Sequence, residues 1–584
     1  MSIFSRLPRK RNNPALKTAA HPPQKRMDPT EMDTNPANTN PASMNRRDIL
    51  KLAAAGAACA LSTAVHASTM PLNPEAPDAP PEPLNPALPG HPEAEQWSTF
   101  EAAFHGPADG NPFTEVAFSA RFQYQHRTVD VPGFYDGDGL YRVRFMPDTP
   151  GRWTFETVST AKELSGRTGA FTCTPASAEN HGPVSTAHQF HFQHADGTPY
   201  FPFGTPCYSM AFMGAPYEQQ TLDTLKTTGF NKVRLCLLPK PLGKTEIFAL
   251  PFARDAAGKN DLARLNPAYF QHVEKRIHDL MLLNIQADVI LFHPYDAWGY
   301  KSMPPEANDL YLKYAVARLS AYRNVWWSVA NEYDLVKSKT MKDWDHFFHV
   351  IQAADPYSHL RSIHHSRVQY DNSKPWVTHA SLQEYDFSKA AEYRAAWGKP
   401  ILWDEIQYEG NISRRWGNLS PEEMTRRFWL AVVAGTYATH GETYISTDGA
   451  PVWSDGGKLH GQSAPRIAFL RSLVERITKV GLNQFDGAYY LSAGQPNDLY
   501  LYYFDLHCVG EYDFPLPVGP QFKCTLIDPW NMTATELPGT CTGKARGAAA
   551  ASTGDNGNTL PKAPGNHITL SGKPGMAALF QKIS

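Results

Sequence analysis

Two segments of the chain each end in a glutamate after a run of apolar and β-branched residues. Glu332 closes the segment 325–332 and Glu405 closes the segment 400–405. Such runs are typical of buried strands in a parallel sheet, so each would carry one carboxyl group to the open end of that sheet. Two carboxyl groups held in this way are what acid/base hydrolysis of a glycosidic bond requires. The pair therefore predicts an enzyme that cleaves glycosidic bonds.

The elements that position these residues alternate between strand and helix. Eight units of this kind over about 280 residues match the size of a (β/α)8 TIM barrel, which we expect at residues 181–481. A doubly wound sheet is the competing topology, but no Gly-rich phosphate loop follows an early strand. Strands are expected at 200–205, 231–238, 286–293, 325–330, 359–364, 376–379, 400–404 and 436–445, and helices at 268–283, 308–319, 341–354, 422–434 and 466–480.

Regions of alternating polar and apolar residues flank the expected barrel. Residues 93–180 contain short alternating runs that are separated by turn clusters such as 135–139 and 147–151. Alternation returns over residues 482–584. Short strands with such turns indicate a β-sandwich on each side, so the predicted fold class is a multidomain chain with a TIM barrel between an N-terminal β-sandwich and a C-terminal antiparallel β-sandwich.

In a barrel, functional side chains collect at the C-terminal ends of the strands. Polar residues close several of the apolar strands of this chain, where they have no packing role in common. Aromatic residues near strand ends suit a carbohydrate cleft, because the flat C–H faces of a sugar ring stack on them. The strand-end residues are Arg234, His293, Asn331, Glu332, His364, His379, Glu405, His440 and Glu442.

These residues resemble the clan of retaining glycoside hydrolases that includes the family 5 cellulases and mannanases. In that clan, an Asn-Glu pair on strand four supplies the acid/base and a Glu on strand seven supplies the nucleophile, which match Asn331-Glu332 and Glu405. More closely, the order of the three domains is similar to bacterial proteins with an apiosidase-like catalytic barrel. The run AGTYATHGETY at 434–444 resembles the eighth-strand signature of that group. The similarity covers most of residues 95–584 and indicates fold and chemistry rather than a particular sugar.

The resemblance implies a double displacement. Glu405 would attack the anomeric carbon, while Glu332 would protonate the departing oxygen and later deprotonate water, with the carboxyl groups about 5–5.5 Å apart. Arg234 would keep Glu405 ionised, and Asn331 would donate to the sugar 2-hydroxyl. Tyr385 is a loose match to the clan's tyrosine that hydrogen-bonds the nucleophile. The other expected substrate-binding residues are His293, His379, Gln383, His440 and Glu442, with Trp298, Trp403 and Trp453 as candidate stacking residues.

The N-terminal segment has the pattern of an export signal. Arg46 and Arg47 precede an apolar stretch at 52–65, and the small-residue site Val65-His66-Ala67 follows. This arrangement resembles a twin-arginine signal peptide within a leader at residues 1–67, followed by a Pro-rich linker at 68–92. The apolar stretch is too short for a convincing membrane span. We therefore expect a protein of the periplasm or the extracellular space that does not stay in the membrane after signal removal.

The net charge and the cysteine pattern limit which partners and cofactors the chain is expected to bind. With 55 basic and 57 acidic residues the net charge is −2, so nothing favours nucleic acid, and the expected partner is a carbohydrate. Six cysteines lie beyond the leader and none forms a CxxC pair, which argues against a zinc knuckle. Cys524 and Cys541 are close enough in sequence to bridge neighbouring strands, but isolated thiols are an equal alternative. No cofactor or metal is predicted, and the oligomeric state is left open.

Two other functions compete with this interpretation. A non-catalytic carbohydrate-binding protein would keep the aromatic residues but would not need both glutamates. A metal-dependent barrel hydrolase would use some of the histidines, although the first three of these precede the first expected barrel strand and no helix carries His-Glu-x-x-His. The histidines concerned are His188, His191, His194, His293, His364, His365 and His440.

Overall fold

The computed structural model describes residues 92–241, 247, 249–445, 452–487, 489–543 and 566–583. The predicted signal peptide and nearly all of the Pro-rich linker lie outside the described residues. No helix in these ranges is long and apolar enough to cross a membrane.

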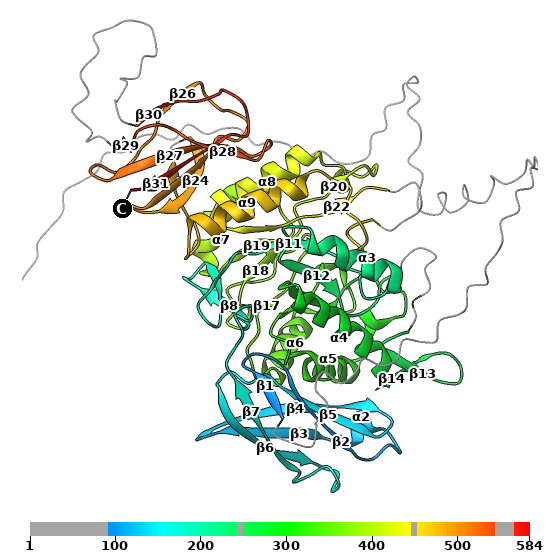
Figure 1. Ribbon diagram of the computed structural model, residues 1–584. Coiled ribbons are helices and arrows are strands. Elements are labelled where there is room, and N and C mark those ends of the chain that lie inside the picture. The colour runs from blue at the N-terminus through cyan, green and yellow to red at the C-terminus, as the bar shows by residue number, and fades with distance from the viewer. Residues whose placement is uncertain are drawn as a thin grey trace, which may run out of the picture. The chain divides into compact units, whose positions relative to one another are not determined.

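A barrel-like sheet forms the centre of the described chain (Figure 1). Its eight described strands pair in parallel in the order β17-β16-β15-β12-β11-β21-β19-β18. A parallel bridge between His364 and Ser381 joins the two end strands of this order, so the sheet closes on itself. The strands are β11 (Phe203–Pro206), β12 (Lys232–Cys236), β15 (Gln286–Phe292), β16 (Val325–Ala330), β17 (Arg361–Ser362), β18 (Ala380–Leu382), β19 (Ile401–Trp403) and β21 (Tyr437–Thr439).

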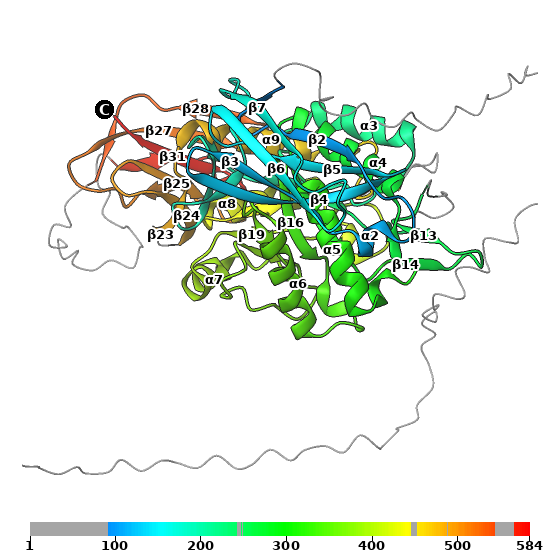
Figure 2. The same cartoon turned by 90° about the horizontal axis from the view of Figure 1, so that it is seen from below.

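Helices alternate with these strands and bury their apolar faces against the outside of the sheet. Cap residues define several helix starts: Thr340 and Asp343 form a capping box at α6, and Ser420 caps α8. Helices α5 and α6 lie side by side (Figure 2), as do α8 and α9. The helices are α3 (Ala215–Lys226), α4 (Pro267–Leu282), α5 (Pro305–Leu319), α6 (Met341–Ala354), α7 (Ala390–Trp397), α8 (Pro421–Val433) and α9 (Ser463–Ile477), with short 3-10 turns η1 (Tyr300–Ser302), η2 (Tyr333–Leu335), η3 (Phe387–Lys389) and η4 (Arg415–Gly417).

Before the barrel, one seven-stranded sheet of the described chain has the order β1-β7-β6-β3-β4-β5-β2. Although β2 and β7 are far apart in this order, Phe100 of β2 stacks on Phe171 of β7 at 4.0 Å. The sheet therefore folds over an aromatic core. Its elements are β1 (Glu93–Glu95), β2 (Phe100–His105), α2 (Pro112–Glu115), β3 (Phe118–Tyr124), β4 (Arg127–Gly137), β5 (Leu140–Phe145), β6 (Gly151–Ser159) and β7 (Thr168–Thr174).

After the barrel, antiparallel strands enclose a core that includes Tyr502, Phe514, Phe522 and Phe580. The described cysteines are free thiols, Cys524 and Cys541 among them. The strands are β23 (Asn483–Gly487), β24 (Tyr490–Gln495), β25 (Leu499–Tyr503), β26 (Glu511–Asp513), β27 (Gln521–Asp528), β28 (Thr533–Glu536), β29 (Cys541–Thr542), β30 (His567–Thr569) and β31 (Ala577–Lys582). Small sheets elsewhere are formed by β8 (Val184–Ala187), β9 (His191–His194) and β10 (Pro199–Tyr200), by β13 (Phe252–Arg254) and β14 (Asn260–Leu265), and by β20 (Glu409–Gly410) and β22 (Glu442–Thr443).

Candidate active site

A cavity of about 710 Å³ lies at the C-terminal ends of the barrel strands. Glu332, two residues beyond β16, and Glu405, two residues beyond β19, both line it. Because the parallel strands end at the same edge of the sheet, two segments 73 positions apart in the sequence meet here. The full lining is Tyr208, Cys236, Lys240, Pro241, Tyr295, Asn331, Glu332, Ser366, Gln383, Tyr385, Glu405, Gln407, Tyr408, Trp416 and Ser454.

Glu332 occupies a strained and poorly hydrated position. Its φ of 47° lies in the left-handed region, which a residue with a side chain seldom adopts outside sites that hold it in place. Burial, together with the negative charge of Glu405, raises the pKa of Glu332 to about 7. Its Oε2 atom is buried and finds no hydrogen-bond partner among the described residues. This carboxyl group is therefore suited to hold a proton near neutral pH.

Glu405 lies in a more polar environment. The Tyr208 hydroxyl donates to its Oε1 at 2.8 Å, and Gln383 Nε2 donates to its Oε2 at 2.9 Å. A second hydroxyl, that of Tyr408, lies 3.1 Å from the Tyr208 hydroxyl. Burial raises the pKa of Glu405, but the positive charge of Arg234 and these hydroxyls act in the opposite direction. The cavity therefore brings together a carboxyl group whose pKa is raised to about 7 and one whose pKa burial also raises, but next to which a cation and hydroxyl donors act to keep the anion.

Two cations and two anions lie beneath the cavity, inside the barrel. Lys232 contacts Asp288 at 2.6 Å and Asp404 at 2.9 Å, and Arg234 contacts Asp288 at 3.3 Å. Ser381 and Thr439 also donate to Asp404, and Lys232 and Arg234 hold the pKa of that carboxyl well below its usual range in spite of its burial. Asp404 is thus fixed in the barrel interior, whereas its neighbour Glu405 faces the cavity.

The structure brings part of the predicted site together. Asn331, Gln383 and Tyr385 line the cavity with both glutamates. Arg234 is fully buried below the cavity and donates to Asn331 Oδ1 at 3.2 Å, so it can influence a ligand through its charge and through Asn331. The ring of Tyr385 lies under the Arg427 guanidinium at 4.4 Å. The hydroxyl that bonds Glu405 comes from Tyr208, which corrects the loose match to Tyr385.

Three of the predicted histidines are buried outside the cavity lining. His293 follows β15, and its Nε2 donates to the Leu238 carbonyl at 2.8 Å. The prediction for His379 is wrong in position: β18 begins at Ala380, so this histidine lies at the N-terminal end of the strand, against Trp326 at 5.3 Å. His440 follows β21, and Glu442 belongs to β22. Both side chains are buried, and neither lines the cavity.

The predicted stacking residues also lie elsewhere. Trp403 and Trp453 are fully buried, with their indole N–H groups donating to Thr436 and Thr205 at 2.8 Å, so neither face is open to a sugar. Trp298 packs against the barrel core and lies near-parallel to Tyr300. The prediction for Trp403 fails because residues on both faces of a parallel strand can be buried. Trp298 and Trp453 lie on connecting segments outside the barrel strands, and neither lines the cavity.

Apart from Tyr385, the aromatic residues that line the cavity were not predicted from the sequence. Tyr208 lies two residues beyond β11, at a strand end that is not among the predicted strand-end residues. Tyr408 and Trp416 lie in the segment after β19, and Tyr295 lies after β15. Tyr295 and Trp416 expose about half of their surface (48% and 50%), so their rings are open to a ligand. Only the position of Tyr208 carried a sequence signal; the others lie on irregular segments without one.

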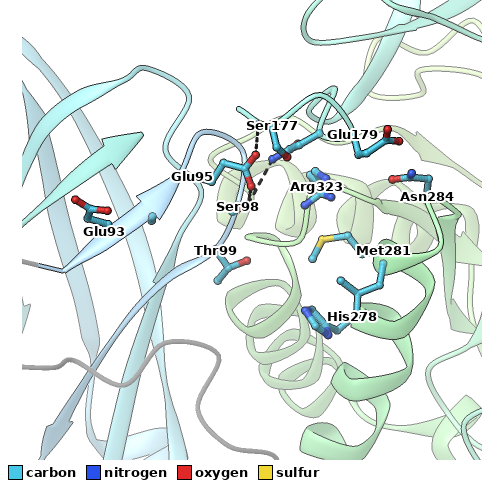
Figure 3. A pocket seen from close by; sticks show the side chains of 13 residues that line it. Glu93, Glu95, Ser98, Thr99, Ser177, Glu179, His278, Met281, Asn284 and Arg323 are labelled. Atoms are coloured by element: carbon cyan, nitrogen blue, oxygen red, sulfur yellow. Dashed lines mark hydrogen bonds between the residues drawn. The ribbon is translucent and has the colours of Figure 1, made fainter. Parts of the chain in front are cut away.

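A second cavity, of about 560 Å³, has different chemistry (Figure 3). Asn284 and Arg323, which line it, come shortly before β15 and β16, so it lies toward the N-terminal ends of the strands. Partial burial tends to raise the pKa of its Glu95, but hydrogen bonds from Ser177 and Ser98 leave that pKa lowered. Its other glutamates, Glu93 and Glu179, are exposed. This cavity therefore lacks the proton-holding carboxyl group found beside Glu405.

All residues that line the first cavity fall within a segment that matches a known protein family. Residues 186–477 match the sequence profile of the apiosidase-like catalytic domain, and residues 93–160 and 490–549 match two domains of unknown function, DUF5060 and DUF5605. A solved structure from Bacteroides vulgatus ATCC 8482, assigned as a glycoside hydrolase, is 36% identical with a TM-score of 0.77, covering 84% of this chain and 100% of the other.

A glycoside hydrolase family 5 structure from Bacteroides vulgatus ATCC 8482 shares the fold at 14% identity. Its TM-score is 0.51, with 68% of this chain and 93% of that chain covered. Comparison with curated proteins gives no match.

Proposed function

Because this chain belongs to the apiosidase-like catalytic-domain family and is a glycoside hydrolase, we propose that it cleaves O-glycosidic bonds of a poly- or oligosaccharide with retention of anomeric configuration. The observation that carries the proposal is the pair of unlike carboxyl groups, Glu332 and Glu405, in one cavity. The proposed architecture is a (β/α)8 TIM barrel at 181–481 between β-sandwich domains at 93–180 and 482–584.

The proposed reaction has two steps. In the first, Glu405 attacks the anomeric carbon while protonated Glu332 donates its proton to the departing glycosidic oxygen, which leaves a covalent glycosyl-enzyme. In the second, ionised Glu332 takes a proton from water, and the water oxygen displaces Glu405 from the anomeric carbon. The raised pKa of Glu332 supports the acid role, because a proton donor must still hold its proton at the working pH.

Neighbouring residues would position the sugar. The hydrogen bond from Arg234 to Asn331 Oδ1 turns the amide so that its N–H groups remain to donate to a sugar 2-hydroxyl. Gln383 and Tyr208 hold the two oxygens of Glu405. The half-exposed rings of Tyr295 and Trp416 replace the buried tryptophans as stacking surfaces for a sugar ring.

We further propose export through the twin-arginine signal at Arg46 and Arg47 to the periplasm or beyond. The sequence pattern alone supports this. Replacing both arginines by lysine should keep the protein in the cytoplasm of a host with this export system, as read by fractionation and immunoblotting. Unchanged export of the double variant would contradict the proposal.

The mechanism is tested after a screen of plant and bacterial polysaccharides has identified a cleaved substrate. Glu332→Gln and Glu405→Gln should each lower kcat by at least about 10³-fold, since either loss removes a group that acts in the transition state. Glu179→Gln, in the second cavity, is the matched control and should keep wild-type kinetics. Full activity in both active-site variants would refute the mechanism.

Two further measurements separate the roles. Proton NMR of the first product formed should show the same anomer as the substrate, and the opposite anomer would rule out retention. Glu332→Ala should still react with an aryl glycoside whose leaving group needs no proton, and azide should then yield a glycosyl azide of retained configuration. An inverted azide from this variant would mean that the two roles are exchanged.

A further inference from the structure

A second group of titratable side chains lies buried next to the active-site wall. Glu409 of β20, His440 after β21 and Glu442 of β22 each offer a ligand atom, and these atoms lie within 4.8 Å of one another. All three side chains are buried, with exposed fractions of 0%, 1% and 0%. None of them lines the catalytic cavity.

The two carboxyl groups are held in place by main-chain donors and, at Glu409, also by the hydroxyls of Tyr444 and Ser463. Glu442 accepts N–H bonds from His460 at 2.6 Å and Gly461 at 2.8 Å, and Glu409 accepts from the N–H groups of Gln462 at 2.8 Å and Ser463 at 3.2 Å. Among the described residues, no lysine or arginine pairs with either carboxyl group. Two carboxylates buried together without a cation are expensive, so the group needs either a proton or a metal ion.

Of these two possibilities, the imidazole of His440 favours a metal ion. Its Nε2 atom is buried, has no hydrogen-bond partner among the described residues and lies 4.0 Å from Glu409 Oε2. On the other side of the ring, Nδ1 lies 3.4 Å from the Thr205 hydroxyl, and Phe230 stacks on the ring at 5.0 Å. The ring is thus fixed with one polar atom directed at a carboxylate that is too far away to bond it.

We propose that Glu409, His440 and Glu442 bind a divalent first-row transition-metal ion such as Zn²⁺. One imidazole nitrogen with two carboxylates suits Zn²⁺ or Mn²⁺, whereas Ca²⁺ and Mg²⁺ prefer oxygen ligands alone. Bonds of about 2.0–2.2 Å would draw the three ligand atoms together by small rotations. The ion would neutralise the buried carboxylates and satisfy the free nitrogen.

The metal site would support the active site without entering the reaction. Glu409 and Glu442 face each other across the parallel pair β20 and β22. Tyr408, directly before Glu409, lines the catalytic cavity and hydrogen-bonds Tyr208, which in turn bonds Glu405. Clamping β20 to β22 would therefore fix the segment that carries Tyr408, which gives the three ligands a positioning role.

The test uses the full chain purified without a metal-affinity tag. Plasma mass spectrometry should find about one transition-metal ion per chain, and chelation should lower Tm until ZnCl2 restores it, because an ion that binds the folded state stabilises that state. His440→Gln and Glu442→Gln should reduce the metal content at least tenfold. His194→Gln, a partly buried histidine outside the group, is the control and should keep the metal.

Less than a tenth of an ion per chain, with no Tm response to Zn²⁺ or Mn²⁺, would overturn the proposal, and so would full metal content in both variants. If the variants fail to fold, anomalous scattering at the zinc edge from crystals of the wild-type chain decides. A peak between the three side chains supports the site, and a peak elsewhere or none refutes it. These readouts do not depend on catalysis, so failure of the two-glutamate mechanism would leave them unaffected.

Discussion

At the scale of single residues, the proposed acid and nucleophile roles of Glu332 and Glu405 depend on the surroundings of each side chain. Glu405 lies next to the Arg234 cation and to hydroxyl donors, whereas Glu332 is buried without a cation beside it. Because the two negative charges repel each other, the two carboxyl groups titrate as a pair, and the charge of Glu405 helps to raise the pKa of Glu332 to about 7. The proposed reaction needs Glu332 to be protonated while Glu405 is ionised, and this difference between the two groups would provide both states.

The pH dependence of catalysis should report this proton. Burial and the charge of Glu405 raise the pKa of Glu332 to about 7, so the group stays protonated below that pH and loses its proton above it. A general acid must be protonated, so we expect kcat/KM to fall above about pH 7. With an aryl glycoside that has a good leaving group, kcat/KM should fall much less above pH 7, because cleavage of the bond then needs little protonation of the leaving group. The same limb for both substrates would contradict the assignment.

Tyr208, absent from the sequence prediction, should prove a positioning residue for the nucleophile. Tyr208→Phe removes the 2.8 Å hydrogen bond to Glu405 Oε1, and loss of that donor raises the pKa of Glu405. A hydrogen bond to a charged group contributes about 1.5–3 kcal/mol, so the acidic limb of the kcat/KM profile should move up by about one pH unit or more.

Tyr385→Phe is the matched comparison for Tyr208→Phe, because its ring lies under Arg427. It should leave the acidic limb of the profile in place. A larger shift in Tyr385→Phe than in Tyr208→Phe would restore Tyr385 as the hydrogen-bond partner of the nucleophile.

These residues also show how far sequence reading reaches at a site. Glu332 and Glu405 were predictable because each ends a strand whose apolar run is visible in the sequence. Trp403 and Trp453 were mistaken for exposed rings, since whether a strand-end ring is covered depends on distant partners such as Thr436 and Thr205. Contacts across the barrel leave no local pattern.

At the scale of elements, β12 supplies two cations to the barrel interior. Every residue of β12, Lys232–Cys236, is buried, and its Lys232 and Arg234 face carboxylates of β15 and of the segment after β19. Charges in a strand interior are costly unless they are paired, so Lys232 is needed to balance Asp288 and Asp404. The pairing also fixes Arg234 below Glu405, the proposed nucleophile.

Lys232→Met should therefore destabilise the fold. It leaves two buried carboxylates without their main cation, and removing one partner of a buried pair costs about 3–5 kcal/mol. Urea unfolding followed by tryptophan fluorescence measures the loss. Lys226→Met, which breaks the exposed 2.8 Å pair with Asp223, should change stability by less than about 1 kcal/mol. Equal losses of stability from the two substitutions would show that the interior ion pairs stabilise the fold no more than an exposed pair does.

Most barrel elements were predictable because apolar periodicity continues through them. Strand β16 and helix α6 occupy the predicted residues 325–330 and 341–354. The strand expected at 376–379 instead begins at Ala380, because the preceding residues form turns that tie Thr378 to Arg361. Helices α3 and α7 were not predicted; α3 contains few apolar residues, and α7 is only eight residues long.

At the scale of the whole described chain, a buried ion network joins the N-terminal sheet to the barrel helices. Glu274 of α4 accepts from Arg318 of α5 at 2.5 Å and from Arg144 of β5 at 2.8 Å. Arg144 also binds Glu101 of β2 at 2.7 Å, and both guanidinium groups lie over the ring of Phe134. Because these groups are out of water, their pairing makes the folding of the sheet depend on the barrel.

Glu274→Gln should weaken that dependence. The substitution keeps the shape of the side chain but removes the negative charge between two buried guanidinium groups, a change that we expect to cost about 3–5 kcal/mol. Calorimetry of the full chain should then show the main transition at lower temperature and broadened or divided, as the sheet and the barrel unfold less cooperatively. Glu536→Gln, in an exposed 2.8 Å pair with Lys523, should leave the trace unchanged. A single sharp transition at the wild-type temperature in Glu274→Gln would mean that apolar contacts alone couple the two regions.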